Sequence, residues 1–84
     1  MATYKVLFWK DIPSVIEAED SDEDVKIHMG VRFDQLIDAK AMDDGLVGSD
    51  EFLEHWTYGE EIERPGSAQE VAEAVKKEYE EKFL

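Results

Sequence analysis

The stretch TYKVLFWKDI, residues 3–12, constrains the fold most, because an extended chain with this sequence is apolar on both of its faces. Its aromatic and β-branched residues are typical of a strand. One face would carry Tyr4, Val6 and Phe8, and the other Leu7 and Trp9. Such a strand is either central in its sheet, or has helices over one face and a second face that is partly exposed.

Residues 13–30 predict a β-hairpin that follows this strand. Val15–Glu19 would form one arm and Val25–Met29 the other. The acidic sequence DSDED at residues 20–24 would form the turn, because Asp and Ser favour turns through local side-chain hydrogen bonds to the backbone.

Two segments have the apolar period of amphipathic helices. The first covers residues 31–45, ends at Gly45 as a C-cap, and has an apolar stripe of Phe33, Leu36, Ile37 and Ala41. The second covers residues 66–84, where Ser67 and Glu70 have the spacing of a capping box. Its apolar stripe consists of Val71, Val75 and Tyr79.

The segment between the two helices, residues 46–66, allows two interpretations. Phe52, Trp56 and Tyr58 can share one face of a strand. Alternatively, Ser49 and the acids after it can cap a short helical turn within residues 49–56. We expect a loop or turn followed by a strand over residues 54–63.

The resulting element order, β-β-β-α-β-α, places the chain in the α+β class. We expect one small domain over residues 1–84, with a mainly antiparallel sheet and two helices packed on one face. This length leaves room for one core. Because the sequence contains no cysteine, disulfides, thiolate metal sites and a cysteine nucleophile are excluded.

Charge limits the classes of partner. Twenty-two acidic residues oppose nine basic ones, which gives a formal net charge of −13. Such a surface repels nucleic-acid phosphates and anionic membranes, so neither is expected to bind. It suits cations, a basic protein partner, or a salty cytoplasm in which the fold would loosen at low ionic strength. The N-terminal apolar run is too short to span a bilayer, and we expect a cytoplasmic protein, as a monomer or weak dimer.

Short motifs occur in order along the chain: DIP after the first strand, RF, ID and AM on the first helix, FLEHW, and RPGSAQEVAEAV at the start of the last helix. Together they resemble the small bacterial and archaeal proteins grouped as the virulence-factor domain family. The resemblance covers almost the full chain. It implies a compact cytoplasmic module without an assigned reaction, and the name of the family does not imply that this chain acts in infection. In that family the hairpin turn is often basic, whereas residues 19–24 here read EDSDED.

The acidic turn has one feature of a cation site. Asp20, Asp22 and Asp24 alternate as at the start of a calcium-binding loop, but valines stand where that loop needs glycine and glutamate. Weak cation binding by residues 19–24 is therefore a third-ranked hypothesis for the function.

The sequence shows no catalytic motif, and we predict no catalytic residue, cofactor or metal site. The serines are best explained as caps and turn residues, and no glycine-rich phosphate loop is present. His28 and His55 would converge on a metal only if the second hairpin arm lay beside the fourth strand.

The candidate binding residues are Trp9, His55, Trp56, Tyr58 and Arg64. Trp56 is expected to pack in the core, while Tyr58 and Trp9 would rim an exposed patch close to an arginine, as in many binding hot spots. The first hypothesis is a non-catalytic protein-interaction or accessory module with a protein partner. The second is a small enzyme or small-molecule binder with a pocket lined by Trp9, His55 and Trp56.

Overall fold

The computed structural model describes residues 1–46, 48 and 50–83. Within these residues the elements, in chain order, are β1 (Ala2–Trp9), β2 (Ile12–Glu19), β3 (Asp24–His28), α1 (Val31–Asp43), α2 (Asp50–Glu54), β4 (Trp56–Tyr58), β5 (Ile62–Arg64) and α3 (Ala68–Phe83).

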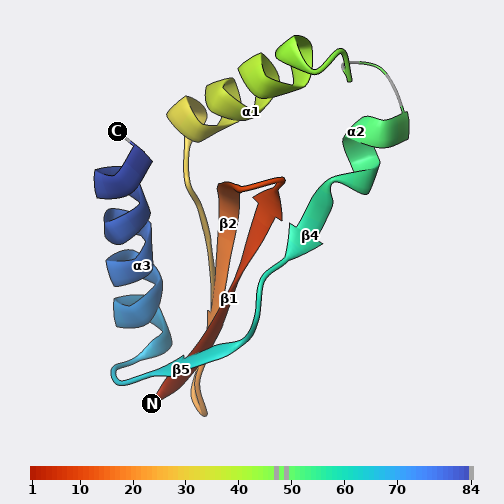
Figure 1. Ribbon diagram of the computed structural model, residues 1–84. Coiled ribbons are helices and arrows are strands. Elements are labelled where there is room, and N and C mark those ends of the chain that lie inside the picture. Colours follow the sequence, from red (N-terminus) through yellow and green to blue (C-terminus); the bar gives the residue numbers. More distant parts are fainter. Residues whose placement is uncertain (47, 49, 84) are drawn as a thin grey trace.

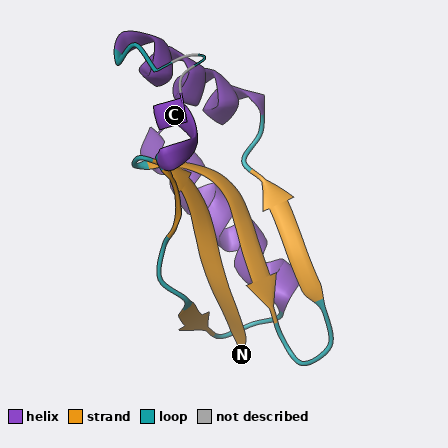
Figure 2. Ribbon diagram, turned by 90° about the vertical axis from the view of Figure 1, so that its right-hand side faces the viewer, coloured by secondary structure: helices purple, strands orange, loops and turns teal. Residues whose placement is uncertain are grey.

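The strands form one antiparallel sheet with β1 at its centre. The strand order is β3-β2-β1-β4, and β5 pairs with β1 beside β4. Helix α3 lies along one face of the sheet, and α1 crosses one end (Figure 1). Figure 2 looks onto the face turned away from α3, which we call the open face. The predicted α+β class, with a mainly antiparallel sheet, is confirmed.

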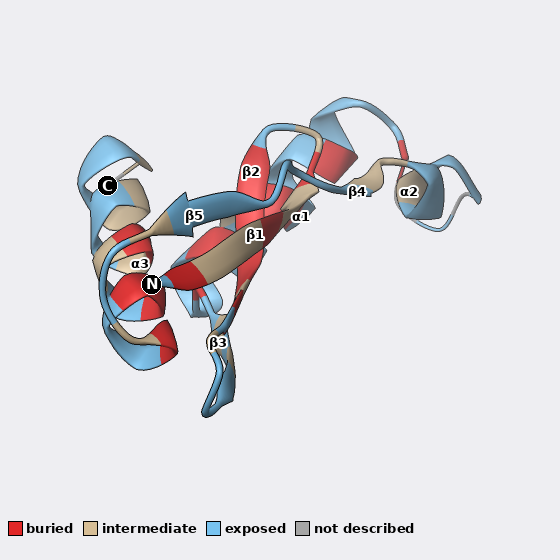
Figure 3. Ribbon diagram, turned by 90° about the horizontal axis from the view of Figure 1, so that it is seen from below, coloured by how far each residue is buried: buried red, intermediate tan, exposed pale blue. Residues whose placement is uncertain are grey.

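The core lies between the sheet and the helices. Its largest fully buried side chains are Trp9, Phe33, Ile16, Val71, Val75 and Pro13. Edge-to-face aromatic pairs join the layers: the Phe8 ring on β1 lies 6.0 Å from Tyr79 on α3, and Phe33 on α1 lies 5.7 Å from Phe83 on α3. Figure 3 shows buried segments, coloured red, on β1, β2 and α3.

The predicted single strand over residues 54–63 is wrong, because the structure divides it into β4 and β5. The two strands pair with opposite halves of β1, Leu7–Trp9 and Ala2–Tyr4. Between them the Phe8 ring lies against the backbone, so that a Cβ placed on Gly59 would be 3.0 Å from Phe8 Cε2. A side chain at this position would have to displace the Phe8 ring, so glycine is favoured here, and the chain leaves the sheet directly after it.

Of the two interpretations of residues 49–56, the helical turn is the correct one for the described part, since α2 occupies Asp50–Glu54. The predicted cap at Ser49 lies outside the described residues. The capping box of α3 is confirmed: Glu70 N–H donates to Ser67 Oγ, and Ser67 N–H donates to Glu70 Oε1, both at 3.2 Å.

Candidate functional site

The open face carries rows of side chains that run across the strands. Residues directly opposite one another in antiparallel strands point to the same face, so the pairing register defines each row. The apolar row consists of Tyr58, Leu7, Val15 and His28. The charged row consists of Lys5, Glu17 and Lys26. The acidic row consists of Glu63, Thr3, Glu19 and Asp24.

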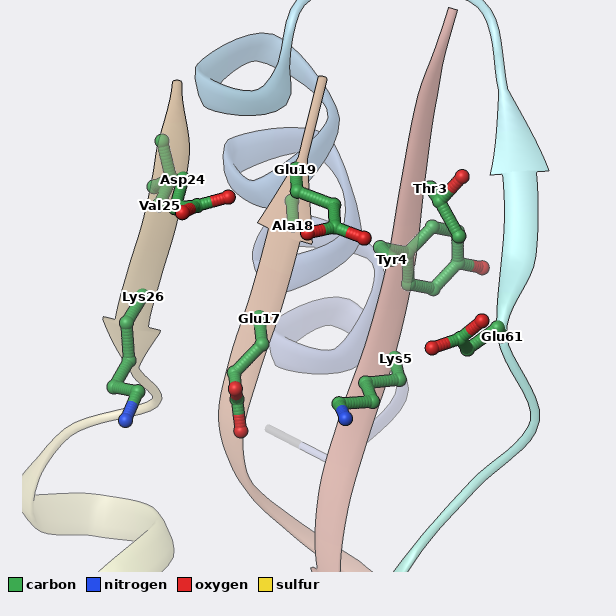
Figure 4. Close-up of a pocket in the computed structure, with 10 residues that line it drawn as sticks. All are labelled: Thr3, Tyr4, Lys5, Glu17, Ala18, Glu19, Asp24, Val25, Lys26 and Glu61. Atoms are coloured by element: carbon green, nitrogen blue, oxygen red, sulfur yellow. The ribbon is translucent and has the colours of Figure 1, made fainter. Parts of the chain in front are cut away.

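A groove of about 300 Å³ lies between the charged row and the acidic row. Figure 4 shows the side chains of Lys26, Glu17, Lys5 and Glu61 in succession across the strands, with Asp24, Glu19 and Thr3 above them. Four carboxylates and two ammonium groups therefore line this groove, which gives it a negative balance. An anionic groove of this kind favours basic ligands.

Tyr58 stands at one end of the apolar row and is 53% exposed. The Lys5 ammonium lies 4.5 Å from the centre of its ring, within range of a cation–π contact. Interaction with the Glu17 carboxylate raises the pKa of the Tyr58 hydroxyl above its ordinary value. The exposure predicted for Tyr58 is confirmed, and its neighbours hold the ring in place on the open face.

The prediction that Trp9 rims an exposed patch is wrong, because this side chain is 0% exposed. Helix α2 covers it: the Phe52 ring lies 5.3 Å from the Trp9 ring, and Trp9 Nε1 donates a hydrogen bond of 2.8 Å to the Phe52 carbonyl. A buried indole N–H needs such a partner, and the fold supplies it from a helix 43 positions along the chain.

His55 and Trp56 are half-buried and belong to the same aromatic cluster. The His55 ring lies 5.8 Å from Trp9, and the Trp56 ring lies 6.1 Å from Phe52. The second hypothesis placed a pocket among Trp9, His55 and Trp56. Phe52 packs against both tryptophans in that place, and the groove described above is lined by other residues.

Arg64 lies away from Tyr58. Its guanidinium forms two parallel hydrogen bonds, of 3.2 and 2.5 Å, with the Glu78 carboxylate on α3. This contact lowers the pKa of Glu78. Arg64 therefore ties β5 to α3 on the helix side of the sheet, whereas Tyr58 lies on the open face.

The acidic turn between β2 and β3 packs on the N-terminus of α3. Asp20 Oδ2 accepts a 2.7 Å hydrogen bond from Ala68 N–H, and Asp20 Oδ1 accepts bonds from the backbone N–H groups of Asp22 and Glu23. Gln69 N–H donates to Glu23 Oε1 at 3.4 Å. Carboxylates suit the positive end of a helix dipole, so two acids of this turn have a structural role.

Asp20 is expected to stabilise the domain in a pH-dependent way. Its hydrogen bonds, the one from Ala68 N–H first, lower its pKa below 3.8 in the folded state. The contribution is therefore complete above the ordinary pKa and is lost as the pH falls through the lowered one. We expect D20A to lower the thermal midpoint by several degrees at neutral pH, with the difference from wild type shrinking at acidic pH.

Thermal unfolding followed by circular dichroism between pH 2 and pH 7 measures this dependence. D22A is the matched control, because the Asp22 carboxylate makes no hydrogen bond among the described residues. An equal loss for D20A and D22A, or a loss for D20A that does not change with pH, would contradict the assignment.

The two histidines do not converge. His28 ends β3, at one edge of the sheet, and His55 precedes β4, at the opposite edge. Across the part of the chain that the structure describes, no group of three or more His, Asp or Glu side chains is placed to hold a metal ion. A metal site shared by the two histidines required the second hairpin arm, β3, to lie beside β4, and these strands are at opposite edges of the sheet.

The open face also contains three charged residues that the sequence analysis did not identify as candidates. Lys5, Glu17 and Lys26 were not candidates, since they are far apart in the sequence and each looks like an ordinary surface charge. Strand alternation places each of them on the polar side of its strand, but only the register brings them into one row.

Comparison with known proteins tests the resemblance. A family model described as "Virulence factor" matches residues 7–83. The chain belongs to the virulence-factor family. The motifs DIP, FLEHW and RPGSAQEVAEAV all fall within the matched part of this family member. Searches of curated proteins and of solved structures gave no match. None of its helices, over the residues described, has both the length and the apolar character of a bilayer span.

Proposed function

We propose that this domain is a non-catalytic module that binds a basic, extended segment of a partner protein across its open face. The observation that carries the proposal is the sheet face left uncovered by α3, with an exposed tyrosine beside an anionic groove. Two-layer α+β domains bury one sheet face, and a free second face is available for a partner.

The contacts on this face support an anchor at Tyr58. Tyrosine combines a large apolar surface with a hydroxyl group and is enriched among residues that dominate binding energy. Here Leu7 lies directly opposite Tyr58 and is half-buried, whereas Val15, the next residue of the row, is only 8% exposed and adds little accessible surface. A partner side chain placed over Tyr58 and Leu7 would meet side chains that are already packed against their neighbours. Binding would therefore cost little conformational entropy on this side of the interface.

The charges on the face favour a basic partner. Glu17, Glu19, Asp24 and Glu61 line the groove. Of the two lysines there, Lys5 is held over the Tyr58 ring. Lysine or arginine side chains of a partner would meet carboxylates along the groove. The net charge of −13 would attract such a partner from a distance, and association should slow as salt is added.

The test is a binding comparison of wild type, Y58A and L53A. Leu53 is the control, because it is 68% exposed but lies on α2, outside the row that contains Tyr58 and outside the lining of the groove. We expect a basic partner purified with the wild-type domain to bind Y58A about 30-fold more weakly or worse, and L53A unchanged. Isothermal titration at two salt concentrations measures both effects.

A synthetic peptide rich in lysine and arginine provides a direct probe that needs no identified partner. In an NMR titration we expect shift changes at Tyr58, Glu17 and Glu19, and none on the outer side of α3. Equal affinity of the partner for Y58A and wild type, or peptide-induced shifts confined to other surfaces, would overturn the proposed function.

A further inference from the structure

Among the described residues, no strand pairs with the outer edge of β3, which is the longer of the two edges of the sheet. The other edge is covered by β4 and β5, each of three residues, and Pro65 follows β5 directly. Short, interrupted strands and proline protect an edge against further pairing. By contrast, β3 runs for five residues, Asp24–His28, without glycine or proline, and Figure 2 shows no element beside its outer side.

The hydrogen bonds at the two ends of the β2–β3 ladder show which backbone groups face this edge. Asp20 N–H donates to the Glu23 carbonyl at 3.0 Å, and Met29 N–H donates to the Ser14 carbonyl at 2.9 Å. In an antiparallel pair such bonded positions recur at every second residue. Val25 and Ile27 therefore bond to β2, while the N–H and C=O groups of Asp24, Lys26 and His28 point outward.

The charges that lead to this edge alternate in sign, and among the described residues the alternation ends at the edge without an acidic neighbour on the outer side of its last lysine. The charged row runs Lys5, Glu17, Lys26 from β1 to β3, with alternating signs, and ends at the edge. Neither Lys26 nor Asp24 takes part in an ion pair within 4 Å among the described residues. An acidic group placed next to Lys26, beyond the edge, would continue the alternation.

We propose that β3 pairs with β3 of a second copy of this chain, antiparallel and related by a two-fold axis at Val25. In this register Asp24 of each copy lies opposite Lys26 of the other. Both are outward-facing positions, so each such pair can exchange two backbone hydrogen bonds. The alternating row of one copy then continues across the edge as Lys5, Glu17, Lys26 and the Asp24 of the second copy.

The other registers that match the outward-facing groups are less favourable. If the second strand is shifted by two residues, Lys26 lies opposite Lys26 of the second copy. If it is shifted by four residues, Lys26 lies opposite His28. In the two remaining registers only one outward-facing position overlaps, and Asp24 lies opposite Asp24 or His28 opposite His28. Like charges directly opposite destabilise a strand pair, and of these registers only the one at Val25 places a carboxylate opposite Lys26, so charge favours it. A two-fold arrangement is closed, and the pairing stops at two copies.

A charge exchange tests both the pairing and its register. We expect D24K and K26D each to weaken self-association about tenfold or more, because both symmetry-related pairs become repulsive. The double variant D24K/K26D restores an opposite charge at each position and should return the dissociation constant to near the wild-type value. Sedimentation equilibrium at about 0.15 M salt, with protein up to millimolar concentration, measures all four proteins.

Hydrogen exchange provides an independent readout of the same pairing. Increasing protein concentration should slow exchange of the Asp24 and Lys26 amide protons, while those of Val25 and Ile27, already bonded to β2, serve as internal controls. A wild-type protein that remains monomeric at millimolar concentration would overturn the proposal. So would a double variant as weak as the single ones, or a dimer whose Asp24 and Lys26 amides exchange freely. None of these outcomes depends on the basic partner.

Discussion

Replacement of Trp9 by alanine is expected to unfold the domain or to bring it close to unfolding. Trp9 is the largest fully buried side chain, and removal of a buried tryptophan costs about 3–5 kcal/mol. A domain of this length has a total stability of about 4–13 kcal/mol. The loss is large because the indole fills space between β1 and α2 and also bonds the Phe52 carbonyl.

Urea denaturation followed by circular dichroism measures the effect, and W9F separates its two parts. Phenylalanine keeps most of the ring packing but cannot donate to the Phe52 carbonyl, so W9F should lose much less stability than W9A. If W9A unfolded at the same urea concentration as wild type, the placement of Trp9 in the core would be incorrect.

Replacement of Phe33 by alanine is expected to have the second-largest effect, a loss of about 3–5 kcal/mol. Phe33 is 1% exposed and joins α1 to the last turn of α3 through the Phe83 ring, 5.7 Å away. The cavity left by alanine would separate these two helices, because neither backbone can move inward without disturbing its packing on the sheet.

V31A is the matched control for F33A, since Val31 lies two positions earlier on α1 and is 69% exposed. We expect V31A to change the free energy of unfolding by less than about 0.5 kcal/mol. A loss below about 1 kcal/mol for F33A, or equal losses for the two variants, would show that α1 does not depend on this aromatic contact.

Helices α1 and α3 and the first three strands could be predicted because their signals are local. The capping box of α3 lies within four consecutive positions, Ser67 to Glu70, and the structure forms both of its hydrogen bonds. The two apolar faces of the first strand allowed a central position as one of two interpretations, and the sheet places β1 at its centre. In each case the residues that decide the structure are neighbours in sequence, and tertiary contacts agree with them.

The errors arose where the deciding contact is distant in sequence. The break between β4 and β5 begins at Gly59, where the chain packs against the Phe8 ring, a residue far away in the sequence. The burial of Trp9 depends on a five-residue helix that covers the end of β1. The rows of the open face depend on register, which alternation alone does not determine. For this reason Tyr58 could be named as a candidate, but its neighbours Lys5 and Glu17 could not.

The bond from Ala68 N–H to Asp20 joins positions 48 residues apart and links two elements in folding. The hairpin turn between β2 and β3 completes the hydrogen bonding of the first turn of α3, and α3 in return holds the hairpin turn against the domain. Such mutual dependence favours unfolding as one cooperative unit over separate fraying of the helix. The amide proton of Ala68 should therefore exchange with solvent mainly through global unfolding, although it lies at a helix terminus.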